Sequence, residues 1–193
     1  MKIIDLPFEG LKLIELVVHG DARGFFVERF RVDVFREHGL PTDFAQENHS
    51  RSAPGVLRGL HYQVDPAQGK LIGVVRGRIW DVVVDIRTDS PTFGRSYGVE
   101  IVDVNGLLLW VPAGFAHGFC VLGDEPADVL YKVDGLYNPA TEGGIRYDDP
   151  ELAIEWPLTR PTVSARDIGL PSFREYRTSP VDWSAILTSD LRK

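Results

Sequence analysis

The sequence predicts an all-β protein, organised as a closed barrel or as the two facing sheets of a jelly roll. Short segments rich in Val, Ile, Phe, Tyr and Trp recur along the 193 residues, and these side chains are favoured in strands. The 19 glycines and 13 prolines fall largely between such segments, where they mark turns. Helical patterns are few. Many short strands with few helices are typical of sheets that close or fold over themselves.

Nine segments have the composition of strands. They span residues 11–18, 24–30, 56–62, 70–75, 78–86, 96–102, 107–111, 119–122 and 129–133. The sequence around Gly77 predicts a hairpin between the fourth and fifth of them, because glycine accommodates the positive φ of a tight turn.

Three short segments have helical features. Residues 32–38 place Val32 and Phe35 three apart and end before Gly39 and Pro41. Residues 164–167 begin with a serine that suits a helix start, and residues 183–191 suit a short terminal helix. The chain has no internal repeat or linker. We therefore expect one jelly-roll domain over residues 1–193, with a C-terminal extension from about residue 150.

The charge and hydropathy of the chain argue against nucleic acid and membranes as partners. Lys and Arg number 21 and Asp and Glu number 28, so the net charge is 21 − 28 = −7. An acidic chain is poorly suited to bind nucleic acid or an anionic membrane surface. No segment has the apolar length of a membrane span or the pattern of a signal peptide. We expect a cytoplasmic protein with neither nucleic acid nor membrane as a partner.

Cys120 is the only cysteine, so neither an intramolecular disulfide nor a multi-cysteine metal site can form. Its apolar neighbours predict a buried side chain rather than a reactive thiol.

Polar residues gather in two segments, 44–51 and 57–63. Strict alternation along a strand places Arg58 on one face and His61 on the other. Taken alone, His61 could be an ordinary core histidine whose ring is hydrogen-bonded. However, Asn48, Arg58 and Lys70 all lie within thirteen residues of it, and that density indicates a binding site.

Several chemistries lack their usual sequence patterns. The chain has no Gly-x-Ser-x-Gly elbow and no Gly-rich phosphate loop. Metal-binding jelly rolls called cupins carry a His-x-His pair, but here His61 is followed by Tyr62 and Gln63, and Lys70 adds a cation nearby. Two histidines without a supporting carboxylate fall short of a usual ligand set. We therefore expect neither a metal nor another cofactor.

The remaining chemistry is acid–base catalysis. A neutral histidine is a good base near pH 7, and a tyrosine can return a proton. A lysine can stabilise a developing oxyanion, and an arginine can bind a phosphate with two hydrogen bonds. This set of side chains suits proton abstraction beside a carbonyl group of a phosphorylated substrate.

An ordered series of motifs carries a family resemblance over about residues 1–175. The motifs are DARGFFVE (21–28), QENHS (46–50), GVLRGLHYQ (55–63), QGK (68–70), GRIWDV (77–82), DIR (85–87), SPTFG (90–94), PAGFAHGF (112–119), YK (131–132), YNP (137–139), DDP (148–150), WP (156–157) and SARD (164–167). In this order they resemble the dTDP-4-dehydrorhamnose 3,5-epimerase family, whose members are metal-free cupin jelly rolls.

The resemblance implies epimerisation of dTDP-4-dehydro-6-deoxy-D-glucose at C3 and C5, both beside the C4 ketone. It implies that His61 is the base and that Asp167 holds its imidazole. Lys70 would stabilise the enolate, and Tyr131 would donate the proton from the opposite face. No cofactor is implied, because the ketone of the substrate is the electron sink.

Binding roles follow from the same motifs. The resemblance implies diphosphate binding by Arg23 and Arg58, and nucleotide binding by Glu28, Gln46 and Asn48. The other implied substrate-contacting residues are His117, Tyr137, Glu142, Arg166 and Phe26. In this family the N-terminal segment crosses to the partner subunit, so a homodimer is implied.

Other interpretations stay open at this point. Arg23 and Glu28 also fit a surface pair, Tyr131 a core tyrosine, and Asp167 a simple turn cap. A single-site epimerase of a related dTDP-4-keto-6-deoxysugar would keep nearly the same residues, and residues 133–136 depart from the commonest form of the rhamnose pathway. A sugar-binding cupin without activity and a metal-dependent cupin enzyme are the two further alternatives.

Overall fold

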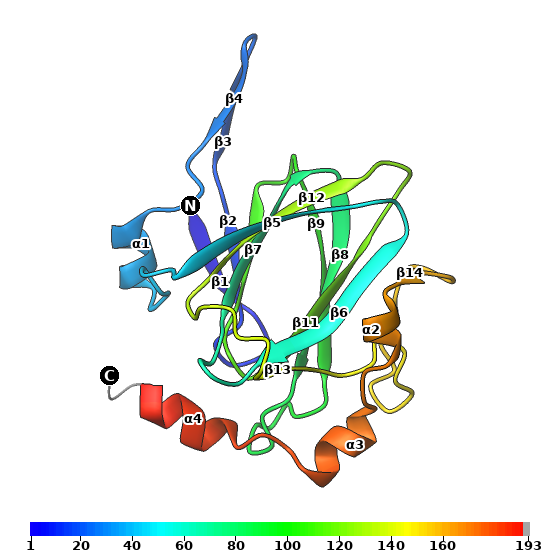
Figure 1. Cartoon of the computed structure of the whole chain (residues 1–193). Coiled ribbons are helices and arrows are strands. Elements are labelled where there is room, and N and C mark those ends of the chain that lie inside the picture. The colour runs from blue at the N-terminus through cyan, green and yellow to red at the C-terminus, as the bar shows by residue number, and fades with distance from the viewer. Residues whose placement is uncertain (191–193) are drawn as a thin grey trace.

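The computed structural model describes residues 1–190 and consists mainly of two antiparallel sheets that face each other (Figure 1). The first sheet has six strands. In spatial order they are β1 (Lys2–Asp5), β2 (Lys12–Glu15), β10 (Leu107–Val111), β7 (Lys70–Arg76), β12 (Ala127–Val133) and β5 (Gln46–Ser52).

The second sheet runs in the order β13 (Glu142–Gly144), β6 (Val56–Gln63), β11 (Phe115–Val121), β8 (Arg78–Asp85) and β9 (Ser96–Val102). The short strand β14 (Thr162–Val163) pairs with β6 in parallel. Two facing antiparallel sheets, with neighbouring strands distant in sequence, confirm the predicted all-β jelly roll.

Apolar side chains fill the space between the sheets on the side of β8, β9 and β10. This core takes Ile72 and Val129 from the first sheet and Ile79, Val83 and Phe119 from the second. The predicted strand 78–86 is apolar on successive residues because both of its faces are covered, one by this core and the other by the C-terminal segment.

Helices cover the outer faces. Helix α1 (Val32–Glu37) packs Phe35 on the first sheet, as the sequence predicts. The second sheet is covered by α2 (Ala165–Ile168), α3 (Phe173–Thr178) and α4 (Trp183–Asp190), with Trp183 fully buried. The predicted end of the last helix, Leu191, lies outside the described residues. No helix in residues 1–190 is long and apolar enough to cross a membrane.

The predicted hairpin at Gly77 is wrong. β7 pairs with β10 and β12, whereas β8 pairs with β9 and β11, so the turn carries the chain from one sheet to the other. Gly77 has a φ of +76°, and a Cβ there would lie 2.6 Å from the Pro126 carbonyl oxygen. Glycine is thus required by the turn, but the turn does not join paired strands.

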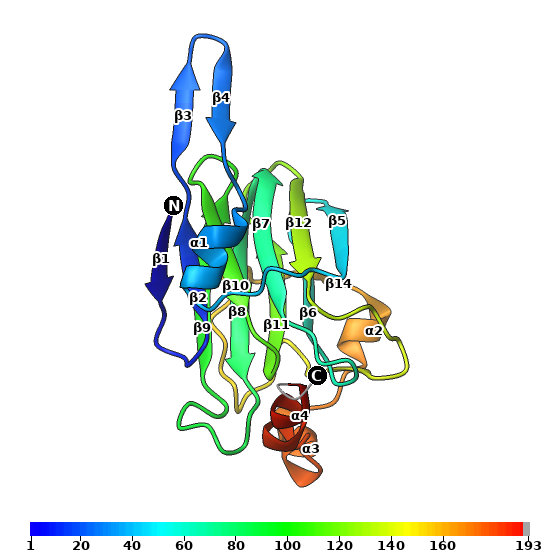
Figure 2. The same cartoon turned by 90° about the vertical axis from the view of Figure 1, so that its left-hand side faces the viewer.

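A separate hairpin projects from the barrel (Figure 2). It consists of β3 (Val18–Asp21) and β4 (Gly24–Val27), which pair only with each other. The sequence predicts a single strand over residues 11–18, but the structure divides this segment between β2 and β3. Phe25 and Phe26 on β4 are 71% and 68% exposed.

Candidate active site

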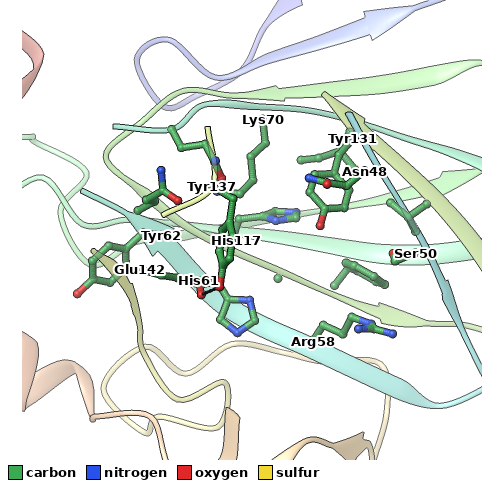
Figure 3. Close-up of a pocket in the computed structure, with 16 residues that line it drawn as sticks. Asn48, Ser50, Arg58, His61, Tyr62, Lys70, His117, Tyr131, Tyr137 and Glu142 are labelled. Carbon is green, nitrogen blue, oxygen red and sulfur yellow. Dashed lines mark hydrogen bonds between the residues drawn. The ribbon is translucent and has the colours of Figure 1, made fainter. Parts of the chain in front are cut away.

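Polar side chains line a cavity of about 210 Å³ between the two sheets, on the side of β5 and β6 (Figure 3). The first sheet and the segment that follows it contribute Asn48, Ser50, Gln68, Lys70, Ile72, Val129, Tyr131 and Tyr137. The second sheet contributes Arg58, His61, Tyr62, Gln63, His117, Gly118, Phe119 and Glu142. The structure thus brings eight of the fourteen predicted site residues into one cavity.

A bulge in β6 places Arg58 and His61 on the same face. His61 lies opposite His117 and Arg58 opposite Phe119, so three steps along β6 match two along β11. Gly59 makes the bulge with a φ of +124°, and a Cβ there would lie 2.5 Å from the Gly118 Cα. Strict alternation, which separates Arg58 from His61, is therefore wrong at this position.

His61 is held by a buried carboxylate. Its Nε2 lies 2.8 Å from Asp167 Oδ1, and the other carboxylate oxygen accepts a hydrogen bond from the Gly59 amide at 3.2 Å. Ser164 caps α2 by accepting a hydrogen bond from the Asp167 amide. Burial alone would raise the pKa of Asp167, but the hydrogen bonds from His61, Gly59 and Ser164 outweigh it and lower the pKa. The carboxylate is therefore ionised and fixes the imidazole.

His117 forms a second pair of the same kind. Its Nε2 lies 2.9 Å from Asp81 Oδ2, and Asp81 is fully buried on β8. Burial raises the pKa of Asp81, although His117 opposes the shift. Asp81 is missing from the site that the sequence predicts. Its signal is a carboxylate within an otherwise apolar strand, Ile79 to Val84, where an ionisable side chain needs a partner.

Lys70 begins β7 and reaches the cavity from the first sheet (Figure 3). Burial lowers its pKa to about 8, although the charges of Asp134 and Glu142 oppose the shift. No carboxylate in residues 1–190 forms an ion pair with it. A partly desolvated cation without a partner is suited to stabilise an oxyanion.

Tyr131 faces the cavity from β12, in the sheet opposite to that of His61 (Figure 3). Burial raises its pKa, and the charge of Glu142 adds to the effect while Arg58 opposes it. The hydroxyl is therefore protonated at neutral pH. It makes no hydrogen bond to any residue in the described part of the chain, so it is available to a ligand.

Two polar networks border the cavity. Gln46 donates a hydrogen bond to Asn48 and accepts one from the Tyr137 amide. The Tyr137 hydroxyl donates to Glu142 at 2.8 Å, and Arg166 pairs with the same carboxylate at 2.6 Å. These contacts connect the predicted residues Gln46 and Arg166 to the site, although neither lines the cavity.

Three predicted residues lie elsewhere in this chain. Arg23 and Phe26 belong to the projecting β3–β4 hairpin, and Glu28 follows it. Arg23 pairs with its neighbour Asp21. All three side chains are exposed, and none lines the cavity. Within a single chain, they are not part of this site.

Within residues 1–190, no cluster of three or more His, Cys, Asp or Glu side chains is arranged to hold a metal ion. Cys120 is buried as the sequence predicts, and burial raises the pKa of its thiol to about 12. The cavity instead offers a carboxylate-supported histidine on one wall. A protonated tyrosine and a lysine lie on the other, which is an arrangement for proton transfer on two faces of one ligand.

Known proteins are similar to this chain in sequence and in fold. The family model for dTDP-4-dehydrorhamnose 3,5-epimerase matches residues 5–175. The dTDP-4-dehydrorhamnose 3,5-epimerase of Shigella flexneri is 48% identical over 175 residues, which cover 90% of this chain and 96% of that protein. The enzyme of the same name from Neisseria gonorrhoeae is 50% identical over 169 residues. These cover 87% of this chain but 51% of that protein, so the chain spans about half of its length.

Two further relatives extend the comparison. The dTDP-4-dehydrorhamnose 3-epimerase of Streptomyces niveus is 43% identical over 169 residues, which cover 86% of this chain and 81% of that protein. The solved structure of a Mycobacterium tuberculosis epimerase superposes with a TM-score of 0.91 at 40% identity, and the match covers 97% of each chain. The chain belongs to the dTDP-4-dehydrorhamnose 3,5-epimerase family.

Proposed function

We propose that the protein is an isomerase that converts dTDP-4-dehydro-6-deoxy-D-glucose to dTDP-4-dehydro-L-rhamnose. The observation that supports this proposal most strongly is the position of His61 and Tyr131 on opposite sheets across one cavity. Inversion of a carbon centre requires a proton to leave one face and to return on the other. The two sheets supply one group for each face.

The reaction uses the ketone of the substrate. The C4 carbonyl acidifies the hydrogens on C3 and C5, and His61 removes one of them while Asp167 stabilises the imidazolium. The electron pair moves to the C4 oxygen, where the Lys70 ammonium stabilises the enolate. Tyr131 then donates its proton to the carbon from the opposite face, and the ketone re-forms. Solvent restores the proton of Tyr131 and removes the one on His61, so the same step can proceed at the second carbon.

The other predicted residues bind the substrate in this proposal. Arg58 lies at one end of the cavity and binds the diphosphate, while His117 and Tyr137 contact the sugar and the nucleotide from the walls. Gln46, Asn48, Glu142 and Arg166 complete the binding site at its border.

We further propose a homodimer in which the β3–β4 hairpin reaches the partner subunit. Its exposed phenylalanines form an apolar surface that a partner chain would cover. A hairpin placed in this way would bring Arg23, Phe26 and Glu28 to the cavity of the partner.

Product analysis tests the proposed reaction. The purified protein is incubated with dTDP-4-dehydro-6-deoxy-D-glucose, and the configuration at C3 and C5 of the product is read by NMR. We expect inversion at both carbons. Recovery of unchanged substrate from folded protein would refute the proposal.

One observation favours a second candidate, an epimerase that inverts a single carbon. The Streptomyces niveus relative, a dTDP-4-dehydrorhamnose 3-epimerase, is nearly as similar as the 3,5-epimerases. A product inverted only at C3 would assign this second function.

A further inference from the structure

One of the polar side chains on the inward face of β5 has no hydrogen-bond partner in the described chain. Gln46, Asn48, Ser50 and Ser52 alternate along the strand and face the interior of the barrel. Gln46 and Asn48 bond to each other, and Ser52 accepts a hydrogen bond from Arg58 Nε at 2.9 Å. The Ser50 hydroxyl is buried and has no hydrogen-bond partner in residues 1–190. A buried polar atom left unpaired costs stability, so an orphan in a cavity wall indicates a ligand.

Strand register places Ser50 along the cavity. On β12, Val133 lies opposite Lys70, Tyr131 opposite Asn48, and Val129 opposite Ser50. Inward-facing residues of a strand are about 7 Å apart, so Ser50 lies one such step beyond Asn48, away from Lys70. Ser50 is therefore two such steps from the level of Lys70 and one step from the level of Tyr131.

Arg58 occupies the same end as Ser50 (Figure 3). Two of its guanidinium nitrogens are held by Ser52 and by the Arg51 carbonyl oxygen, while Nη1 has no partner in the described chain. Ile72, Val129 and Phe119 also line the cavity, and Val129 lies directly opposite Ser50. A fixed cation with free donors beside an unpaired hydroxyl suits an oxygen-rich anion.

We propose that the Ser50 hydroxyl donates a hydrogen bond to a diphosphate oxygen of the sugar nucleotide and forms the diphosphate subsite together with Arg58. This inference rests on the proposed function, because that function supplies the diphosphate. Ser50 is a binding residue in this account and takes no part in proton transfer.

Calorimetric titration with dTDP and with thymidine tests the subsite in the full-length protein. We expect Ser50→Ala to weaken dTDP binding roughly tenfold or more, since a hydrogen bond to a charged group is lost, and to leave thymidine binding unchanged. Ser50→Cys fills nearly the same space with a weak donor and should weaken dTDP binding similarly.

Thermal unfolding without ligand separates this role from a structural one. Ser50→Ala should not lower the unfolding midpoint, because it removes an unpaired buried hydroxyl. Ser52→Ala should lower it, since Arg58 loses a bond. Ser96→Ala on the exposed side of β9 is the control and should change neither binding nor stability.

Two results would overturn the inference, and they are distinguishable. If wild-type protein binds dTDP and converts substrate, while Ser50→Ala binds dTDP with unchanged affinity, the subsite is wrong and the proposed function stands. If wild-type protein neither binds dTDP nor converts substrate, the proposed function fails, and the subsite fails with it.

Discussion

At the scale of single residues, Asp167 holds the imidazole of His61 in place. Asp167 contacts Nε2, and within residues 1–190 the other ring nitrogen has no partner. The carboxylate is itself held by the Gly59 amide and by the cap of α2. Asp167 thus fixes the orientation of the imidazole and stabilises its charged form when a proton arrives.

We predict that His61→Ala lowers kcat by about a hundred- to ten-thousandfold, the range that a positioned general base contributes. Asp167→Asn should lower kcat by about a hundredfold, because an amide cannot stabilise the imidazolium. Both kcat values are measured with the same substrate, and circular dichroism checks that the fold is retained. A His61→Ala variant with near-normal turnover would show that His61 is not the base.

We predict that Lys70 lowers the stability of the protein and contributes to catalysis. Its ammonium is partly desolvated and has no ion-pair partner in the described chain, so Lys70→Met should raise the thermal midpoint. The same change should lower kcat roughly a hundredfold while dTDP affinity stays within a few-fold, because the charge acts mainly on the enolate. Weakened binding with an unchanged kcat would contradict this role.

The lowered pKa of Lys70 also predicts a pH dependence. The ammonium is the active form, and it is lost as pH rises through about 8. The kcat of the wild-type protein should therefore fall above pH 8, well before an ordinary lysine would titrate. The residual kcat of Lys70→Met should not show this decrease, and a pH–rate profile from pH 6 to 10 compares the two proteins.

At the scale of elements, the bulge in β6 determines which side chains share the cavity. Arg58 and His61 face the same space because Gly59 adds one residue to β6 relative to β11. Leu57 and Leu60 consequently pack outward, against the segments that cover the second sheet. The bulge therefore couples the packing of the outer layer to the geometry of the site.

We predict that Gly59→Ala lowers the free energy of unfolding by about 3 kcal/mol or more, through backbone strain and the clash with Gly118. Gly24→Ala is the matched control, because Gly24 has a φ of +129° but open space around its Cβ position. It should cost only the strain, about 1–3 kcal/mol. Equal losses in denaturant titrations of the two variants would show that the close approach to Gly118 is unimportant.

The elements that the sequence predicts correctly are those with clear apolar patterns, such as β8 and α1. β5 is not predicted because its inward side chains are polar, and that polarity reflects the cavity rather than a loop. α3 is also not predicted, although Ser172 and Glu175 form a capping box that signals its start. For β5, the pattern fails because the site replaces apolar residues with polar ones.

The candidate site also contains residues that the sequence predicts and residues that it does not. The ordered motifs identify His61, Lys70 and Tyr131, and the fold brings them to one cavity. The motif GRIWDV contains Asp81, but its role is not predicted, because the contact with His117 depends on β8 lying beside β11. The bulge at Gly59 cannot be predicted from the sequence for the same reason, because a bulge is defined only relative to a neighbouring strand.

At the scale of the whole molecule, the C-terminal segment belongs to the barrel. Trp183 is fully buried against the second sheet, and the Tyr176 hydroxyl donates to the Ile86 carbonyl oxygen at 2.7 Å. The organisation as a single domain with this extension stays a prediction, and the contacts support it. The β3–β4 hairpin is the opposite case, because it projects from the barrel and exposes apolar side chains.

We predict a dimer in sedimentation velocity experiments, and we expect Phe26→Asp to weaken it by placing a charge in the proposed interface. Ile168→Asp is the matched control, since Ile168 is 60% exposed on α2, which lies far from the hairpin (Figure 2), and should leave the dimer intact. If Phe26→Asp sediments like the wild type and binds dTDP equally well, the hairpin does not reach the partner site.

In the proposed reaction the protein moves protons at two carbons beside the ketone, and an experiment in heavy water detects both transfers. The wild-type protein is incubated with dTDP-4-dehydro-6-deoxy-D-glucose in D₂O, and the deuterium is located by NMR. Because the Tyr131 hydroxyl exchanges with solvent, we predict deuterium at both C3 and C5 of an L-lyxo product. Folded protein that binds the substrate but leaves both carbons unlabelled would contradict the account.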